Sequence, residues 1–284
     1  MPLINMSQML RKARAEKYAI GAFNILDYNS MKAVIETAQE LKSPVIVQTS
    51  EKTVRFWGFR PIITWIRELT NNSDVPVAIH LDHCKNLDFI KNCIDAGWTS
   101  VMIDASSKPF EENLELSRKV VEMAKPFGVS VEAELGEIGG IEDDIIVNEE
   151  NAHLVNPEKA QIFLKNVDVD CFAPAIGTAH GVYKGKPKIA FDRLKIISNN
   201  TDIPLALHGG TGLSEEVFKN SIALGCAKIN ISTQLKYAFI DGFVGYYNAK
   251  PNEYNPLTLI DAQFKMLKKS VKENIQLFGS TQKA

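Results

Sequence analysis

The sequence is short of the features that mark several other classes of protein. No apolar run approaches the roughly 20 residues that a membrane-spanning helix needs. The first residues do not have the charged and then apolar form of a signal peptide. The formal charge is only -2, and no basic stretch is interleaved with aromatic residues. We therefore expect a small molecule as partner, and neither a membrane nor a nucleic acid.

Cysteine is scarce as well. Only four cysteines occur in 284 residues, and they are scattered without a CxxC pair. This usage indicates a reducing compartment, so we expect the protein to be cytoplasmic. Cys84 is adjacent to His83, but neighbouring residues of a strand point to opposite faces. We therefore expect Cys84 to be a packed thiol rather than a metal ligand.

Strand-like and helix-like segments alternate from end to end of the chain. Eight short β-rich runs are separated by amphipathic stretches with apolar residues at helical spacing, such as 31–41, 110–127 and 215–224. The strand-like runs are 19–23, 44–48, 77–81, 100–103, 130–134, 171–173, 205–207 and 228–231. Eight such units predict an α/β fold, a single-domain (β/α)8 TIM barrel over residues 1–284.

Two segments depart from this repeat. Residues 136–156 are acidic and contain glycines, which favours a mobile active-site loop and is also compatible with an ordinary solvated excursion. From Tyr237 onward the pattern is helical with a break at 248–256, which predicts a C-terminal helical extension.

Histidine is rare too, and its placement is informative. Of five histidines, His83, His180 and His208 each follow a strand-like run. One histidine at a strand end is usually structural, but three at equivalent places indicate a shared task. In a barrel these places are the carboxyl ends of the strands, where chemistry gathers. Three imidazoles with an open fourth position are typical of a catalytic zinc site.

Carboxylates accompany these histidines. Period-two alternation directs Glu132 and Glu134 into the barrel, where a buried carboxylate needs a cation. Lys228 and a metal are equally compatible partners for Glu132. Glu134 is the better candidate for a second metal position, together with Asp104 at the end of the fourth strand.

Asp82 lies one residue before a predicted metal ligand, at the rim of the barrel. A carboxylate there could move a proton to or from a substrate oxygen that the metal polarises. The alternative role is to orient a histidine.

The loops after the last two strands have the composition of a phosphate site. Gly209, Gly210 and Thr211 follow the seventh strand, and Asn230 to Thr233 follow the eighth. Glycines let backbone N–H groups approach an anion, and hydroxyls add donors. A metal and a phosphate pocket at one barrel mouth indicate a small sugar phosphate as substrate, cleaved without a lysine Schiff base.

Several motifs, in order along the whole chain, resemble the class II, zinc-dependent ketose-bisphosphate aldolase family, which includes fructose- and tagatose-bisphosphate enzymes. They are Ala22-Phe23-Asn24, the segment 44–50, His80-Leu81-Asp82-His83, the segments 100–104, 131–140 and 177–184, His208 to Gly212, Lys228 to Thr233 and Phe278-Gly279-Ser280.

The resemblance implies specific roles. His83, His180 and His208 would hold the zinc, and Asp104 and Glu134 would match an alternative metal position. Asp82 would take the proton of the C4 hydroxyl, and Glu142 would handle the proton at C3 of the dihydroxyacetone phosphate enediolate. Substrate and phosphate contacts would come from Asn24, Ser50, Gly181, Gly209, Gly210, Thr211, Asn230, Ser232 and Thr233. A monovalent cation nearby and a homodimer or homotetramer are also implied.

One departure from the family pattern concerns the far end of the substrate. Asn255-Pro256-Leu257 stands where the family has Asp-Pro-Arg, with the arginine lent by a neighbouring subunit to the C6 phosphate. Losing such an arginine costs about 1.5–3 kcal/mol. Either Lys52 or Arg55 replaces it, or the C6 substituent is not an ordinary phosphate; a solvated loop is an equally compatible role for both cations.

The sequence therefore predicts an aldolase that reversibly cleaves a ketose 1-phosphate or 1,6-bisphosphate to dihydroxyacetone phosphate and an aldehyde. One alternative is a metal-dependent barrel hydrolase, although the His-x-His pair common on the first strand of such enzymes is missing. The other is a non-catalytic sugar-phosphate-binding subunit, which would have no use for proton-transferring groups.

Overall fold

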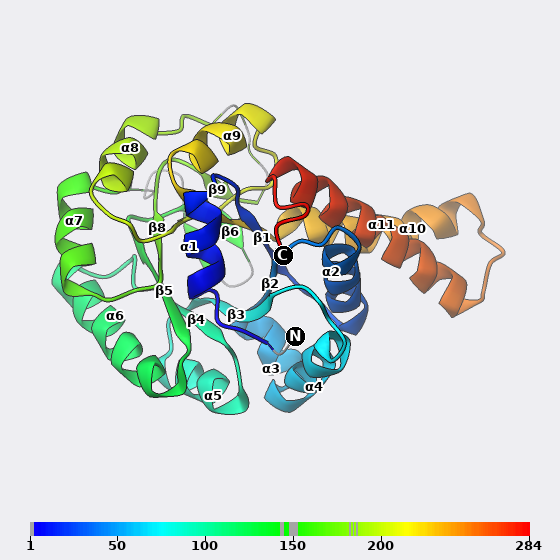
Figure 1. The fold of residues 1–284 in the computed structure, drawn as a ribbon. Coiled ribbons are helices and arrows are strands. Elements are labelled where there is room, and N and C mark those ends of the chain that lie inside the picture. Colours follow the sequence, from blue (N-terminus) through cyan, green and yellow to red (C-terminus); the bar gives the residue numbers. More distant parts are fainter. Residues whose placement is uncertain (1–2, 143–144, 148–152, 182, 184, 186) are drawn as a thin grey trace.

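Eight parallel strands close into a barrel in the computed structural model, in the spatial order β1-β11-β10-β8-β5-β4-β3-β2 (Figure 1). They are β1 (Ile20–Asn24), β2 (Val45–Ser50), β3 (Val77–Cys84), β4 (Ser100–Ile103), β5 (Ser130–Leu135), β8 (Cys171–Pro174), β10 (Leu205–Leu207) and β11 (Cys226–Ile231). The structure describes residues 3–142, 145–147, 153–181, 183, 185 and 187–284. Each strand overlaps a predicted run, so the predicted barrel is confirmed.

Helices surround the barrel, and several of them begin at a side-chain cap. They are α2 (Tyr28–Glu40), α3 (Glu51–Trp57), α4 (Phe59–Thr70), α5 (Leu87–Ala96), α6 (Phe110–Ala124) with a 3-10 turn (Lys125–Phe127), α7 (Pro157–Asn166), α8 (Phe191–Asn199) and α9 (Glu215–Ala223). The side chains that accept a hydrogen bond from a first-turn N–H are Asp27, Ser50, Asn86, Asn156, Ser214 and Asn255. Each such cap stabilises its helix by about 1 kcal/mol.

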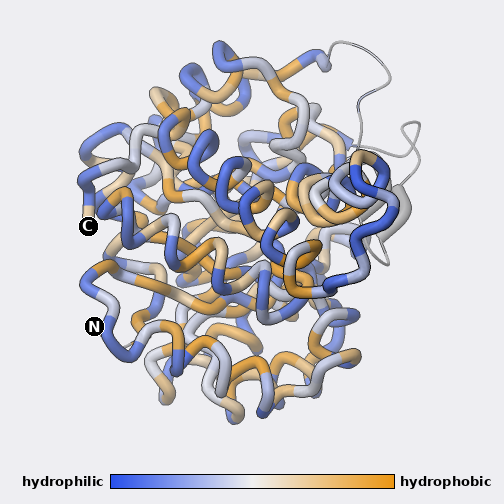
Figure 2. The backbone as a smooth tube through the Cα atoms, turned by 90° about the vertical axis from the view of Figure 1, so that its right-hand side faces the viewer, coloured by the Kyte–Doolittle hydropathy of each residue, from blue (hydrophilic) through white to orange (hydrophobic). Residues whose placement is uncertain are grey.

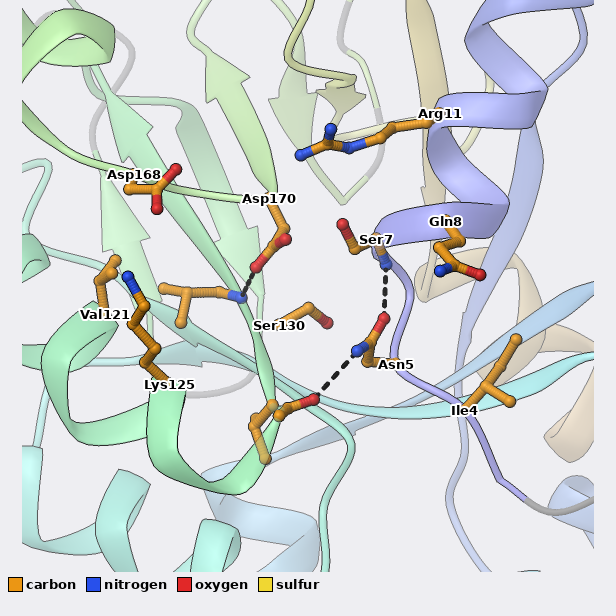
Figure 3. Close-up of a pocket in the computed structure, with 13 residues that line it drawn as sticks. Ile4, Asn5, Ser7, Gln8, Arg11, Val121, Lys125, Ser130, Asp168 and Asp170 are labelled. Carbon is orange, nitrogen blue, oxygen red and sulfur yellow. Dashed lines mark hydrogen bonds between the residues drawn. The ribbon is translucent and has the colours of Figure 1, made fainter.

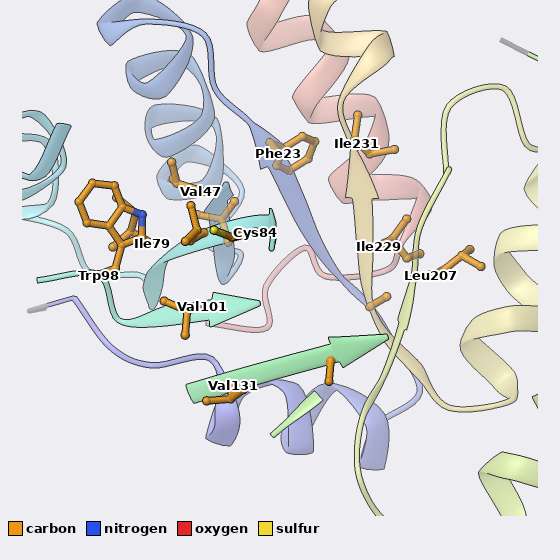
Figure 4. Packing of buried hydrophobic residues seen from close by; sticks show 14 of the residues in the cluster. Phe23, Val47, Ile79, Cys84, Trp98, Val101, Val131, Leu207, Ile229 and Ile231 are labelled. Carbon is orange, nitrogen blue, oxygen red and sulfur yellow. The ribbon is translucent and has the colours of Figure 1, made fainter. Parts of the chain in front are cut away.

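The larger hydrophobic core lies between the strands and this layer of helices. Outward-facing residues such as Val47, Ile79 and Val101 pack with Trp98 in this layer (Figure 4). Cys84 belongs to the same cluster, as expected for a packed thiol, and all four cysteines are free and buried. Figure 2 shows hydrophobic stretches inside the molecule and hydrophilic ones on the outer turns.

A smaller apolar cluster fills the amino-terminal end of the barrel interior. Helix α1 (Ser7–Ala15), which was not predicted, lies across this end of the barrel (Figure 1). The cluster includes Met6, Leu10, Ile20, Ala22, Ile46, Ala78 and Ala206. Towards the carboxyl ends of the strands the buried inward residues become polar. The barrel therefore has a closed apolar end and a polar end.

The last two helices leave the body of the barrel. Helices α10 (Thr233–Ala249) and α11 (Pro256–Leu277) pack against each other and project as a hairpin (Figure 1). The predicted break at 248–256 falls between them. Among the described residues, no helix combines the length and apolar character needed to cross a membrane.

Candidate metal centre and active site

Three histidines meet at the carboxyl end of the barrel. His83 lies in β3, His208 directly follows β10, and His180 lies in β9 (Ala179–His180). One ring nitrogen from each can be chosen so that all three lie within 4.8 Å of one another. Nitrogens around a tetrahedral zinc are about 3.4 Å apart, so small ring movements would bring these three to bonding distance of one ion.

The backbone at His83 is kinked, and the kink is what brings this ring to the site. His83 has a φ of 46°, and the pairing of β3 with β4 shifts register between Leu81 and Cys84. Neighbouring strand residues normally face opposite sides, but a bulge re-aims a side chain. Asp82 and His83 are therefore both buried at the same end of the barrel. A left-handed non-glycine residue costs of order 1–3 kcal/mol and persists where the surroundings enforce it.

Buried carboxylates fix the tautomers of two of the rings. The Nδ1 of His83 lies 3.0 Å from Asp104 Oδ2, and the Nε2 of His208 lies 2.7 Å from Glu132 Oε1. An ionised carboxylate only accepts, so these nitrogens carry the proton and the other nitrogen of each ring keeps a lone pair. Within the described part of the chain, His83 Nε2 and His208 Nδ1 are buried without a hydrogen-bond partner. Two unpartnered lone pairs fit a metal ion.

Asp104 and one further carboxylate, Glu134, lie beside the rings, as the sequence predicts. Burial opposes ionisation of Asp104, but hydrogen bonds from His83 and Ser106 hold its pKa well below the ordinary value. Glu134 Oε2 lies 3.2 Å from His208 Nδ1, and burial together with the charge of Asp104 raises the pKa of Glu134 well above its usual range. A cation between these oxygens would relieve that repulsion. An alternative metal position at Asp104 and Glu134 stays a prediction.

Asp82 is held by two side-chain amides. Its Oδ2 accepts from Asn24 Nδ2 at 2.9 Å, and its Oδ1 accepts from Asn230 Nδ2 at 3.2 Å. Gln48 in turn donates to Asn24 Oδ1 at 2.8 Å. Burial disfavours the charged form, but the positive charge that His83 carries when its ring is protonated, together with that of Lys228, lowers the pKa of Asp82 to about 2. Asp82 is therefore an ionised carboxylate that can accept a proton.

These contacts bear on the predicted roles of Asn24, Asn230 and Glu132. The amides of Asn24 and Asn230, predicted to contact substrate, donate hydrogen bonds to Asp82, and their contact with substrate stays a prediction. Lys228 Nζ lies 3.1 Å from Glu132 Oε2. Of the two partners that the sequence left open for Glu132, the structure therefore shows the lysine.

The predicted phosphate loops lie side by side. A Cβ built on Gly210 would lie 2.8 Å from Asn230 O, so the two loops touch. Ser232 and Thr233 begin α10, and the buried Oγ of Ser232 has no hydrogen-bond partner in the described part of the chain. The hydroxyl of Thr211 accepts from Gln234 N at 3.1 Å, which leaves its proton for another acceptor. The Ser232 and Thr211 hydroxyls lie at the start of a 17-residue helix, a position that suits an anion.

His180 belongs to a small sheet that the sequence did not predict. Strand β6 (Gly139–Glu142) pairs with β7 (Ile145–Val147) and with β9, which contains His180. These strands occupy part of the predicted loop at 136–156, other residues of which lie outside the described ones. Glu142 ends β6, and its side chain is outside the described part of the structure.

Strand β9 is packed tightly between two glycines. A Cβ on Gly140 would lie 2.1 Å from His180 O, and a Cβ on Gly209 would lie 2.4 Å from Ala179 O. The Tyr183 hydroxyl accepts from Ala179 N at 3.0 Å and donates to Gly209 O at 2.7 Å. The strand that carries a predicted metal ligand is thereby fixed to a phosphate loop. Gly181, next in sequence, has a φ of 85°.

A cavity of about 590 Å³ lies at the opposite end of the barrel, beside α1 (Figure 3). Its walls include Arg11, Lys125 and Asp168, together with Asp170, whose carboxylate accepts from Val131 N at 2.9 Å. The three clustered histidines do not line it. The chemistry-bearing groups are therefore concentrated at the carboxyl end of the barrel.

Comparison with known proteins agrees with this geometry. The family model described as fructose-bisphosphate aldolase class-II matches residues 4–283. The fructose-bisphosphate aldolase of Geobacillus stearothermophilus is 43% identical over 287 residues, covering 100% of this chain and 99% of the relative. The chain belongs to the class II fructose-bisphosphate aldolase family. The predicted enzyme class, a lyase of the aldolase type, is confirmed.

Other aldolases similar to this chain do not carry the name fructose-bisphosphate aldolase. The sulfofructosephosphate aldolase of Alkalicoccus urumqiensis is 39% identical over 284 residues, covering 100% of this chain and 99% of the relative. The crystal structure of the YdjI aldolase from Escherichia coli K12 superposes with a TM-score of 0.88 at 34% identity and covers 100% of both chains. The family thus fixes the type of reaction more firmly than the ketose.

The predicted contacts to the C6 end of an aldolase substrate are partly engaged elsewhere. Arg55 Nε donates to Glu51 Oε1 at 2.9 Å, and its guanidinium lies over the Phe89 ring. Lys52 is exposed, and Leu257, near the start of α11, is 74% exposed. Ser50 caps α3 by accepting from Thr53 N at 3.2 Å. Of the two cations, Arg55 is paired with a carboxylate, and Lys52 has no such ion pair within the described part of the chain.

Proposed function

We propose that the chain is a zinc-dependent aldolase that reversibly cleaves a ketose 1-phosphate or 1,6-bisphosphate into dihydroxyacetone phosphate and an aldehyde. One observation carries the proposal: three imidazoles converge beside Asp82, a buried carboxylate that two amides hold. A proton acceptor next to a Lewis-acid site is what cleavage of a β-hydroxy ketone requires.

The residues divide this chemistry among them. His83, His180 and His208 would hold the zinc ion, which supplies a Lewis acid for the ketose carbonyl when bound. Asp82 would accept the proton of the C4 hydroxyl, so that the electron pair of the O–H bond forms the C=O bond of the aldehyde. The electron pair of the broken C3–C4 bond would stay with the three-carbon fragment. Glu142 would return a proton to C3 of the three-carbon product. A monovalent cation near the phosphate remains part of the proposal.

The phosphate of the three-carbon product would lie at the start of α10. The unpartnered Ser232 hydroxyl, the Thr211 hydroxyl and the glycine backbone of the adjacent loop support this placement. Gly181, Gly210 and Thr233 complete the proposed set of phosphate contacts.

The function is tested by release of dihydroxyacetone phosphate from ketose phosphates. We expect a chelator to abolish release and zinc to restore it, and the His83→Ala/His180→Ala double variant to be inactive. His153→Ala is the matched control, because His153 is an exposed histidine outside the cluster. Full activity of the double variant would refute the proposal, and binding without turnover across a ketose phosphate panel would favour the non-catalytic subunit.

The group at C6 is addressed by varying the substrate. Fructose and tagatose 1,6-bisphosphates, fructose 1-phosphate and a C6 sulfonate analogue differ in stereochemistry at C4 or in charge at C6. If Lys52 binds an anionic C6 group, Lys52→Ala raises KM about tenfold for the charged substrates alone. Leu257→Arg is expected to lower KM for the 1,6-bisphosphates if a second subunit contributes this position.

We propose that the α10–α11 hairpin joins two or four copies of the chain. Its exposed large apolar residues include Tyr237, Ile240, Val244, Leu257 and Ile260. A surface of this kind on a projecting hairpin is typical of a self-association site. Ile240→Asp should reduce the mass in solution, whereas Ile162→Asp, at a similarly exposed site on α7, should not; an unchanged mass in both would contradict the proposal.

A further inference from the structure

A continuous chain of buried hydrogen bonds joins Asp82 to His208. Asp82 Oδ1 accepts from Asn230 Nδ2, and Asn230 Oδ1 accepts from Lys228 Nζ at 2.6 Å. The same ammonium group lies 3.3 Å from Glu132 Oε1, which accepts from His208 Nε2 at 2.7 Å. None of the five side chains is more than 4% exposed. The proton acceptor and one metal ligand therefore share a single buried cation.

Lys228 determines how both of its neighbours are oriented. Because Asn230 Oδ1 accepts from the ammonium group, the Nδ2 of the same amide is turned towards Asp82. Because Glu132 is paired with Lys228, its oxygen acts as the acceptor for His208 Nε2 and leaves Nδ1 for a metal. Among the described contacts, Glu132 is the sole carboxylate within ion-pair distance of this lysine.

We propose that Lys228 is a positioning residue for both halves of the active site. Through Glu132 it fixes the tautomer and orientation of His208, and through Asn230 it fixes the carboxylate of Asp82. This inference rests on the proposed function, in which His208 binds the metal and Asp82 accepts the proton. It assigns Lys228 a role beyond charge compensation, and it gives Glu132 a role without metal contact.

The test uses two variants that separate the effect of Lys228 on His208 from its effect on Asp82. Lys228→Met keeps the length of the side chain and removes its charge, leaving Glu132 unpaired. Lys228→Met/Glu132→Gln removes both charges, and the glutamine Oε1 still accepts from His208 Nε2. A buried ion pair replaced on both sides is tolerated better than one broken on one side, so the double variant also guards against misfolding. Met102→Leu is the control, because Met102 is buried on β4 in register with Glu132.

Two readouts are needed, metal affinity and steady-state kinetics. Cobalt binding is followed by its visible absorption in competition with a chelator, without substrate. Lys228→Met should weaken cobalt binding on the order of 10- to 100-fold and lower kcat by a similar factor at saturating metal. The double variant should regain cobalt affinity to within about threefold while kcat stays low, because Asn230 still lacks its partner. KM should change little in either variant, since Lys228 is buried behind Asn230.

Specific outcomes would overturn the proposal. A cobalt affinity of Lys228→Met equal to that of the wild type would refute the role of Lys228 in positioning His208. Recovery of kcat in the double variant would refute its role in positioning Asp82. If the wild-type protein shows no aldolase turnover, the proposed function fails, but the cobalt titration still decides the His208 half by itself.

Discussion

The two ends of the barrel interior come from the same strands and differ in chemistry. The amino-terminal end is apolar and covered by α1, with Met6 and Leu10 packed on Ile20 and Ile46. The carboxyl end contains imidazoles, carboxylates and amides, several of which have buried atoms without a hydrogen-bond partner in the described structure. Burial of apolar side chains at the first end stabilises the folded protein. The unpartnered polar atoms at the second end lower its stability until a ligand binds them. Stability and chemistry are thus assigned to opposite ends.

The largest expected effect comes from removing a proposed metal ligand at the polar end. His208→Ala should lower kcat/KM for the preferred ketose phosphate by about 10³-fold or more, a loss of about 4 kcal/mol of transition-state stabilisation. The free energy of unfolding of the metal-free protein should change little, because Glu132 keeps its ion pair with Lys228. Turnover within tenfold of the wild type would show that the polar end does not depend on this ring.

Asp82, the proposed proton acceptor, should give the next largest effect. Asp82→Asn is expected to lower kcat about a hundredfold or more, because an amide cannot take the hydroxyl proton. Cobalt affinity should fall less than tenfold, since the hydrogen bonds of Asp82 go to Asn24 and Asn230 rather than to a metal ligand. Comparable losses in kcat and cobalt affinity would assign Asp82 to metal binding instead.

A substitution at the apolar end should have the opposite signature. Leu10→Ala should lower the free energy of unfolding by about 3 kcal/mol through lost burial and a cavity, with kcat per folded molecule unchanged. Urea unfolding and active-site titration measure the two quantities. Ile162→Ala, at an exposed position on α7, is the control and should change stability by less than about 0.5 kcal/mol. A reduced kcat in Leu10→Ala would mean that the ends are coupled.

The smallest effect is expected from removing the Tyr183 hydroxyl, which connects β9 to the loop after β10. Tyr183→Phe loses the hydrogen bonds to Ala179 N and Gly209 O, each of which contributes about 1 kcal/mol. We expect cobalt affinity to weaken about fivefold, because β9 carries His180. Tyr254→Phe, at an exposed tyrosine, should leave it unchanged. Equal affinities in the two variants would leave Tyr183 without a role in the site.

The barrel fold and the placing of the polar residues at one of its ends could largely be predicted from the sequence, because both follow simple periodicities. Alternation placed Glu132 and Glu134 in the barrel, and the strand-helix repeat brought His83, His180 and His208 to one end. The kink at His83 could not be predicted, since a left-handed histidine leaves no compositional mark. Strand β9 was missed because two residues are too short for a periodic pattern.

The hydrogen bonds from the two amides to Asp82 could not be predicted from the sequence either. Asn24 and Asn230 are far apart along the chain and meet at Asp82 only because the barrel closes between β1 and β11. Sequence resemblance predicts substrate contacts for both residues, but it gave no sign of their hydrogen bonds to Asp82. Partner choice in a buried polar network depends on three-dimensional register, which no local pattern encodes.

The narrow passage of β9 between Gly140 and Gly209 has a consequence for any redesign of this enzyme. Even a methyl group at either position would meet the main chain of the segment that holds His180. Both positions are therefore restricted to glycine, although neither glycine is itself a proposed metal ligand. An engineer who grafts new loops here to change the ketose accepted must keep both glycines, or the His180 ring, a proposed metal ligand, will be displaced along with the graft.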